Sequence, residues 1–64
     1  MKNLKTIRKQ CGITQAELAR LATVSKSLIV KIESGLRKPS IDVAVRLAAA
    51  LNCTVDDLIE KEPA

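Results

Sequence analysis

The sequence predicts a small all-α domain built from five short helices. No stretch shows the sustained alternation of apolar and polar residues that a half-buried strand requires. The 64 residues include no aromatic side chain, so the core must be packed from Leu, Ile, Val and Ala, which suits small helices that cross closely. Four helix starts are marked by a Ser or Thr that can accept the free backbone N–H groups of a first turn. These residues are Thr14, Ser25, Ser40 and Thr54.

The first helix is expected over residues 3–11. Leu4, Ile7 and Cys11 fall on one side of it, and Gly12 follows where a left-handed residue ends a helix. The second helix is expected to begin at Gln15, because Thr14 and Glu17 have the spacing of a capping box. It ends at about Ala22, and its buried stripe is predicted to consist of Leu18, Leu21 and Ala22.

The third helix is capped by Ser25 and runs to about Ser34, and Gly35 ends it. Ile29 and Ile32 point inward at positions i and i+3. The residues left on the outer side are Lys26, Ser27 and Lys31. The second and third helices thus form a pair joined by a short turn.

The fourth helix follows a basic loop that ends at Pro39, and Ser40 caps it, with Asp42 in its positively polarised first turn. Its inward face is predicted to be Ala44, Leu47, Ala48 and Leu51. Asn52 is suited to a left-handed helix end. A fifth helix begins after Thr54, which forms a capping box with Asp57, and it carries Val55, Leu58 and Ile59. Residues 60–64 are expected to be a frayed tail.

The residues from 4 to 59 resemble the Cro/CI (XRE) family of helix-turn-helix regulators. The likeness is carried by the segment SKSLIVKIESG, the RKPS that follows, and the ending LAAALNCTVDDLI. It implies a compact five-helix, lambda-repressor-like DNA-binding domain with the helix-turn-helix at the second and third helices. The buried places of that motif are matched by Leu18, Ala19, Ala22, Val24, Ile29 and Ile32. A small residue is needed at Ala19, where two helices cross closely.

The turn of the motif departs from the family pattern. The place usually held by Gly is Thr23, so a residue with a side chain is expected in the left-handed conformation, at a cost on the order of 1 kcal/mol.

The charges of the chain are unevenly placed. Residues 1–40 carry nine Lys and Arg against two Glu, a net charge of +7, whereas residues 41–64 carry two basic residues against five acidic ones, a net charge of −3. A basic front half is suited to binding a polyanion, although an ordinary solvated surface would also account for the charges alone.

The resemblance assigns DNA contacts residue by residue. The base contacts it implies are Gln15, Lys26, Ser27 and Lys31. The phosphate contacts it implies are Thr14, Ser34, Arg37, Lys38 and, more weakly, Lys9. The alternative for these polar side chains is a role in solubility alone. Arg8 and Glu33 match an ion pair that links the first helix to the end of the third, with Arg8 structural or shared with a phosphate.

Leu28 and Val30 are apolar where the family tends to be polar. Three roles are open for them: contact with a thymine methyl group, a place in a protein interface, or no role.

The leading functional hypothesis is a transcriptional regulator of double-stranded DNA, a repressor that binds a palindromic operator as a homodimer with the helix over residues 25–34 in the major groove. The possible dimer interface consists of Val43, Ala49, Ala50, Val55 and Ile59. The alternative is a protein-interaction module on the same fold, such as an antitoxin or anti-repressor partner, that uses Leu28 and Val30.

Other classes are disfavoured by composition. The chain has no His, no phosphate-binding glycine loop and no evident pair of catalytic carboxylates, so we expect no enzyme activity and no cofactor. Cys11 and Cys53 lack the spacing and partners of a metal site, and we expect them to be reduced, half-buried packing residues, with a redox switch as the other option. We expect no membrane segment, no small-molecule ligand and a cytoplasmic location.

Overall fold

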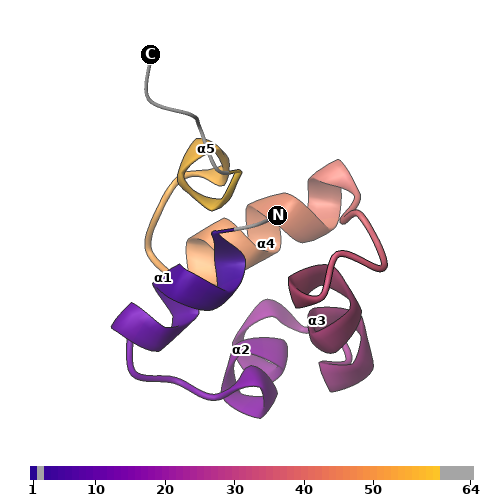
Figure 1. The fold of residues 1–64 in the computed structure, drawn as a ribbon. Coiled ribbons are helices and arrows are strands. Elements are labelled where there is room, and N and C mark those ends of the chain that lie inside the picture. Colours follow the sequence, from indigo (N-terminus) through magenta and orange to yellow (C-terminus); the bar gives the residue numbers. More distant parts are fainter. Residues whose placement is uncertain (2, 60–64) are drawn as a thin grey trace.

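A computed structural model describes residue 1 and residues 3–59, and all its secondary structure in these ranges is helical. The helices are α1 (Leu4–Gln10), α2 (Gln15–Ala22), α3 (Lys26–Glu33), α4 (Ile41–Ala50) and α5 (Val55–Leu58). In Figure 1, α2 and α3 lie together below α4, and α5 lies near the end of α4 that is far from α3. The five-helix, all-α fold expected from the sequence is confirmed. The tail predicted over residues 60–64 lies outside the described residues.

Side-chain caps start four of the helices, as predicted. The hydroxyl oxygens of Ser25 and Ser40 accept the backbone N–H groups of Leu28 at 3.1 Å and of Val43 at 3.2 Å. Asp42 lies in the first turn of α4, where its negative charge interacts favourably with the positive end of the helix dipole. The positions of these caps fix where α3 and α4 begin.

The two predicted capping boxes differ. At α5 the box is complete, because Thr54 Oγ1 accepts the Asp57 N–H at 3.1 Å and the Asp57 carboxylate accepts the Thr54 N–H at 3.1 Å. At α2, Thr14 Oγ1 accepts the Glu17 N–H at 3.1 Å, but the Glu17 carboxylate accepts instead from the Arg20 guanidinium. The predicted bond from the Thr14 N–H to the Glu17 carboxylate was therefore wrong, since Arg20, one turn away, competes for that carboxylate.

At two helix ends, a non-glycine residue adopts the left-handed conformation. Thr23, which follows α2, has φ 58°, and Asn52, which follows α4, has φ 55°. Both conformations were predicted. At Thr23 the strain is offset by backbone bonds that close the turn, because the Thr23 N–H donates to Arg20 O at 3.3 Å and the Val24 N–H to Ala19 O at 3.0 Å.

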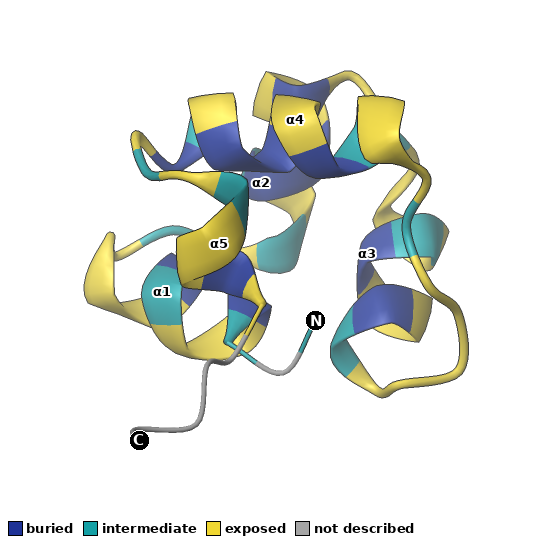
Figure 2. Ribbon diagram, turned by 90° about the horizontal axis from the view of Figure 1, so that it is seen from above, coloured by how far each residue is buried: buried dark blue, intermediate teal, exposed yellow. Residues whose placement is uncertain are grey.

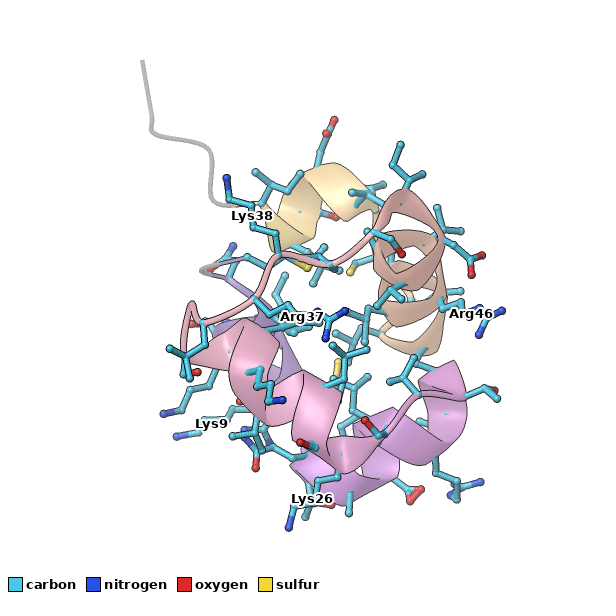
Figure 3. The ribbon with its side chains drawn as sticks, turned by 90° about the vertical axis from the view of Figure 1, so that its right-hand side faces the viewer. Lys9, Lys26, Arg37, Lys38 and Arg46 are labelled. Atoms are coloured by element: carbon cyan, nitrogen blue, oxygen red, sulfur yellow. The ribbon has the colours of Figure 1, made fainter. Side chains whose placement is uncertain are left out.

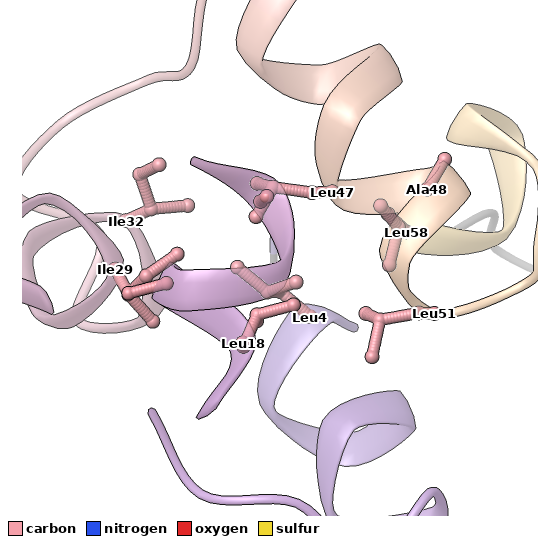
Figure 4. Packing of buried hydrophobic residues seen from close by; sticks show 10 residues of the cluster. Leu4, Leu18, Ile29, Ile32, Leu47, Ala48, Leu51 and Leu58 are labelled. Carbon is pink, nitrogen blue, oxygen red and sulfur yellow. The ribbon is translucent and has the colours of Figure 1, made fainter. Parts of the chain in front are cut away.

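The core is a single cluster to which every helix contributes. Figure 4 shows its apolar side chains converging between the helices. The largest fully buried members are Leu4, Leu18, Ile29, Ile32, Leu47 and Leu58. The predicted inward face of α4 is buried as well. At the start of α1, Asn3 holds α5 in place, since its side-chain amide donates to Asp57 O at 2.9 Å and its N–H to Leu58 O at 3.3 Å.

Two sequence predictions about burial were wrong. Leu21 is 45% exposed, because Leu18, Ala19 and Ala22 already fill the contact of α2 with its neighbours and Leu21 lies at the edge of that stripe. Cys11 is exposed, because α1 ends at Gln10 and turns outward at Gly12, although its thiol still donates to the Leu51 carbonyl at 3.9 Å.

Cys53 is half-buried and free. Its burial raises the pKa of the thiol, and nearby Asp57 and Cys11 raise it further. Within the described ranges, no three His, Cys, Asp or Glu side chains gather as a metal ion would need. No helix among these residues has the length and hydropathy to cross a bilayer.

Candidate nucleic-acid interface

Helices α2 and α3 form a helix–turn–helix unit that presents one face of α3 to solvent. On α2, Ala19 is only 5% exposed and Ala22 only 2% exposed, and this helix packs against both α3 and α4. The left-handed Thr23 and the cap Ser25 define the turn between them. The direction of α3 is therefore set by α2 and by the core.

Buried and exposed residues alternate along α3, so the helix has a buried side and an exposed one (Figure 2). Its exposed residues are Lys26, Ser27, Val30 and Lys31. On the other side, Ile29 and Ile32 are fully buried, and Leu28 is partly buried against the core cluster. We name the four exposed residues the α3 face. Its members include all three α3 residues that the sequence analysis assigned to base contacts.

A buried ion pair anchors α3 to α1. The Arg8 Nε donates to Glu33 Oε2 at 2.7 Å and the Arg8 Nη2 donates to Glu33 Oε1 at 3.3 Å. The guanidinium therefore binds the carboxylate in a bidentate manner. The side chains of Arg8 and Glu33 are only 9% and 4% exposed. Arg8 also donates through Nη1 to Ile13 O at 2.8 Å, which fixes the loop before α2. The pair therefore connects three segments of the fold, and Arg8 has a structural role.

Gln15 belongs to the same network. Its side-chain Nε2 donates to Glu33 Oε1 at 2.9 Å, and the residue is partly buried. Sequence reasoning placed Gln15 among the base contacts and missed this bond, because a Gln and a Glu 18 positions apart carry no signal of contact. One N–H of the Gln15 amide and its carbonyl oxygen remain for a further partner.

The loop after α3 is folded back on the helix end. The Lys31 carbonyl accepts from the Ser34 hydroxyl at 3.1 Å, from the Leu36 N–H at 2.9 Å and from the Arg37 N–H at 3.3 Å. This turn requires Gly35 at φ 81°, a conformation that disfavours side chains. Ser34, Arg37 and Lys38 are all exposed, so the turn carries two cations beside the α3 face.

Figure 3 shows how these cations are arranged around α3. Lys26 extends from one end of the view and Lys38 from the other, with Arg37 between them and Lys9 at the side. Arg46 lies at the opposite edge from Lys9 and Lys38, and it pairs with Asp42 at 3.3 Å. Lys9, Lys26, Arg37 and Lys38 are thus all visible on the side of the molecule that bears α3.

The residues predicted for a dimer interface differ in burial and in surroundings. Val43, Ala50 and Val55 are partly buried against the core cluster, whereas Ala49 and Ile59 are exposed. Val55 and Ile59 line an open, mostly apolar groove of ≈ 440 Å³. Ala49 and Ala50 instead line a second hollow, beside Leu21 and Arg46.

Sequence reasoning missed Ile41, which also lines the groove and is 85% exposed. Its spacing from Ala44 and Ala48 places it on the inward side of an ideal helix. It lies instead in solvent because it occupies the first position of α4, where the chain has just left the loop. No periodicity argument could have found it.

This geometry defines a helix-turn-helix protein with a basic face around its second motif helix, and comparisons with known proteins agree. A helix-turn-helix family model matches residues 4–58. An HTH-type transcriptional regulator of Archaeoglobus fulgidus is 34% identical over 55 residues, covering 86% of this chain and 79% of that protein. The immunity repressor protein of Bacillus phage phi105 is 34% identical over 59 residues, covering 92% of this chain but 41% of the repressor.

A solved structure is also similar. The restriction-modification controller protein C.AhdI from Aeromonas hydrophila superposes with a TM-score of 0.86 and 30% identity, covering 89% of this chain and 86% of that one. The chain belongs to the Cro/CI (XRE) family of helix-turn-helix DNA-binding transcriptional regulators.

Proposed function

We propose that this chain is a repressor that binds a palindromic operator as a homodimer, with α3 in the major groove. The observation that carries the proposal is the α3 face, where Lys26, Ser27 and Lys31 are exposed on a helix whose other side is buried. Side chains of these types donate to the base edges of the major groove, Lys to guanine in particular. The similarity to a phage immunity repressor supports repression rather than activation.

The residues around the α3 face are suited to contacts with the DNA backbone. Lys9, Arg37 and Lys38 are exposed cations that can contact phosphates, as can the Thr14 hydroxyl. The Ser34 hydroxyl can donate to a phosphate only by giving up its bond to the Lys31 carbonyl. Such contacts position a protein on the duplex without specifying its sequence. Gln15, whose amide is held by Glu33, stands at the start of α2, where the helix dipole favours a phosphate nearby.

The test is selection of duplexes from a randomised pool by the purified protein, followed by affinity measurements with single variants. We expect Lys31→Ala to weaken binding and to relax the preference at one base pair of each half-site, by about 1–3 kcal/mol of discrimination. Lys38→Ala should weaken binding to every duplex by a similar factor and leave the base preference unchanged. A pool that shows no enrichment, or a Lys31→Ala variant with an unchanged preference, would contradict the proposal.

Homodimerisation follows from the small size of the reading surface. One α3 face offers few base contacts, and a twofold pair places two of them about 34 Å apart on successive major grooves. We place the contact at the apolar part of the groove, formed by Ile41, Val55 and Ile59 together with Pro39 and Met1, while Lys38, which also lines the groove, is left to the DNA. Burial of Ile41 and Ile59, which are 85% and 50% exposed in the monomer, would supply the hydrophobic stabilisation.

Ile41→Asp is expected to weaken self-association at least tenfold in sedimentation equilibrium measurements. The substitution places a charge in the apolar groove, yet it suits the first turn of α4, so the fold should be kept. Leu36→Asp is the matched control, since Leu36 is 80% exposed and lies outside the groove. Equal association of Ile41→Asp and the parent chain would place the dimer contact elsewhere.

The structure weakens the alternative of a protein-interaction module on α3. That hypothesis used Leu28 and Val30 together, but Leu28 packs against the core and only Val30 is exposed. A single Val does not make an apolar patch of the size that marks a protein interface.

A further inference from the structure

We propose that Val30 is a specificity-determining residue that contacts the 5-methyl group of a thymine in each operator half-site. The inference rests on the proposed function, because it requires α3 to lie in the major groove. It concerns a residue to which the polar contacts described above assign no role.

Val30 lies inside the α3 face rather than at its edge. With about 100° of rotation per residue, the four residues of that face span an arc of about 140°. Val30 stands about 40° from Lys26 and about 60° from Ser27, and Lys31 lies on the far side of Ser27. A helix that brings its lysines and Ser27 to base edges therefore brings Val30 to one as well.

The structure separates Val30 from its apolar neighbour. Leu28 is partly buried and contributes to the core cluster, whereas Val30 is 41% exposed. Leu28 is therefore explained by folding, and Val30 is not. Because Val also has a lower helix propensity than the polar residues common at exposed positions, stability of α3 does not explain it either.

Desolvation decides which base edge can face Val30. When α3 enters the groove, water leaves the base edge opposite this side chain. A donor or acceptor on that edge would lose its hydrogen bond to water, and the isopropyl group of Val cannot replace it. In the major groove the one apolar group that a base pair presents is the thymine methyl. A thymine at that position is favoured by contact and the other three bases are disfavoured by desolvation.

The experiment removes the methyl group without changing any hydrogen-bonding atom. The probe is the duplex enriched by the full 64-residue chain from a randomised pool, in which each thymine is replaced in turn by deoxyuridine. We expect one replacement per half-site to weaken binding about three- to fivefold, the effect of one buried methyl group. Replacements at other thymines serve as internal controls.

The variant Val30→Ala, combined with the deoxyuridine replacement, completes a double-mutant cycle between the side chain and the methyl group. It should bind the parent duplex several-fold more weakly and should no longer distinguish thymine from deoxyuridine at that position. Ser27→Ala, on the same face, should retain the full methyl effect. Thermal melting of each variant checks that folding is unchanged, as expected for exposed positions.

The outcomes separate this inference from the function on which it rests. Enrichment of a duplex with no thymine sensitive to methyl removal would overturn the role of Val30 and leave DNA binding intact. A methyl effect that persists undiminished in Val30→Ala would assign the contact to another residue and overturn the inference equally. If no duplex is enriched, the proposed function and the inference fail together.

Discussion

Glu33→Ala is expected to lower the melting temperature by at least about 12 °C. Among the described residues, the substitution leaves the Arg8 guanidinium, whose side chain is 9% exposed, with the Ile13 carbonyl as its remaining partner. Breaking a buried ion pair by removing one member costs about 3–5 kcal/mol, and each kcal/mol corresponds to about 4–8 °C in a domain of this size. The Gln15 amide also loses its acceptor. Thermal unfolding followed by circular dichroism measures the change.

Lys26→Ala is the control for this prediction. Lys26 is exposed at the start of α3, so its removal should change the free energy of unfolding by less than about 0.5 kcal/mol. Glu33→Gln should fall between the two, since the amide keeps an oxygen for Arg8 but leaves its charge uncompensated. Equal melting temperatures for Glu33→Ala and Lys26→Ala would refute the structural role of the pair.

Ala19→Leu is expected to destabilise the domain by about 1–3 kcal/mol and to impair DNA binding beyond what the loss of folded protein explains. Ala19 is buried on α2, which packs against α3 and α4, and a larger side chain at this place must push α2 away from its neighbours. The displaced α3 would then present its exposed residues in the wrong register for the groove. Chemical denaturation and duplex titration of the folded fraction measure the two effects.

Ala16→Leu provides the matched control, because Ala16 lies on the same helix but is exposed. Its stability should remain within about 0.5 kcal/mol of the parent chain. If Ala19→Leu is as stable as Ala16→Leu, the close approach of α2 and α3 does not depend on a small residue at that place.

Most of the fold was predictable because local signals and helical periodicity agree along the chain. The caps at Thr14, Ser25, Ser40 and Thr54 each mark a helix start in the structure. The prediction failed at positions that tertiary packing decides. Leu21 satisfies the period of a buried stripe, yet smaller residues beside it already fill the contact, and no local pattern shows this.

The sequence predicted which residues of α3 are exposed, but it did not predict the hydrogen bonds around them. The exposed positions of α3 follow from the same periodicity that buries Ile29 and Ile32. The Gln15–Glu33 bond depends on how α1, α2 and the end of α3 meet, which one sequence does not encode in any spacing. Val55 and Ile59 of the proposed dimer groove were named from the sequence, but Ile41 was not, because its place beside them depends on how the start of α4 meets α5.

The salt dependence of duplex binding tests most directly whether the basic surface around α3 binds DNA. Lys9, Arg37 and Lys38 from each of two chains would neutralise about six phosphates, so log affinity should fall against log salt with a slope of about −5. Lys38→Ala should reduce the magnitude of that slope by about 2. A slope near zero, or one that Lys38→Ala leaves unchanged, would contradict the assignment of this surface to DNA.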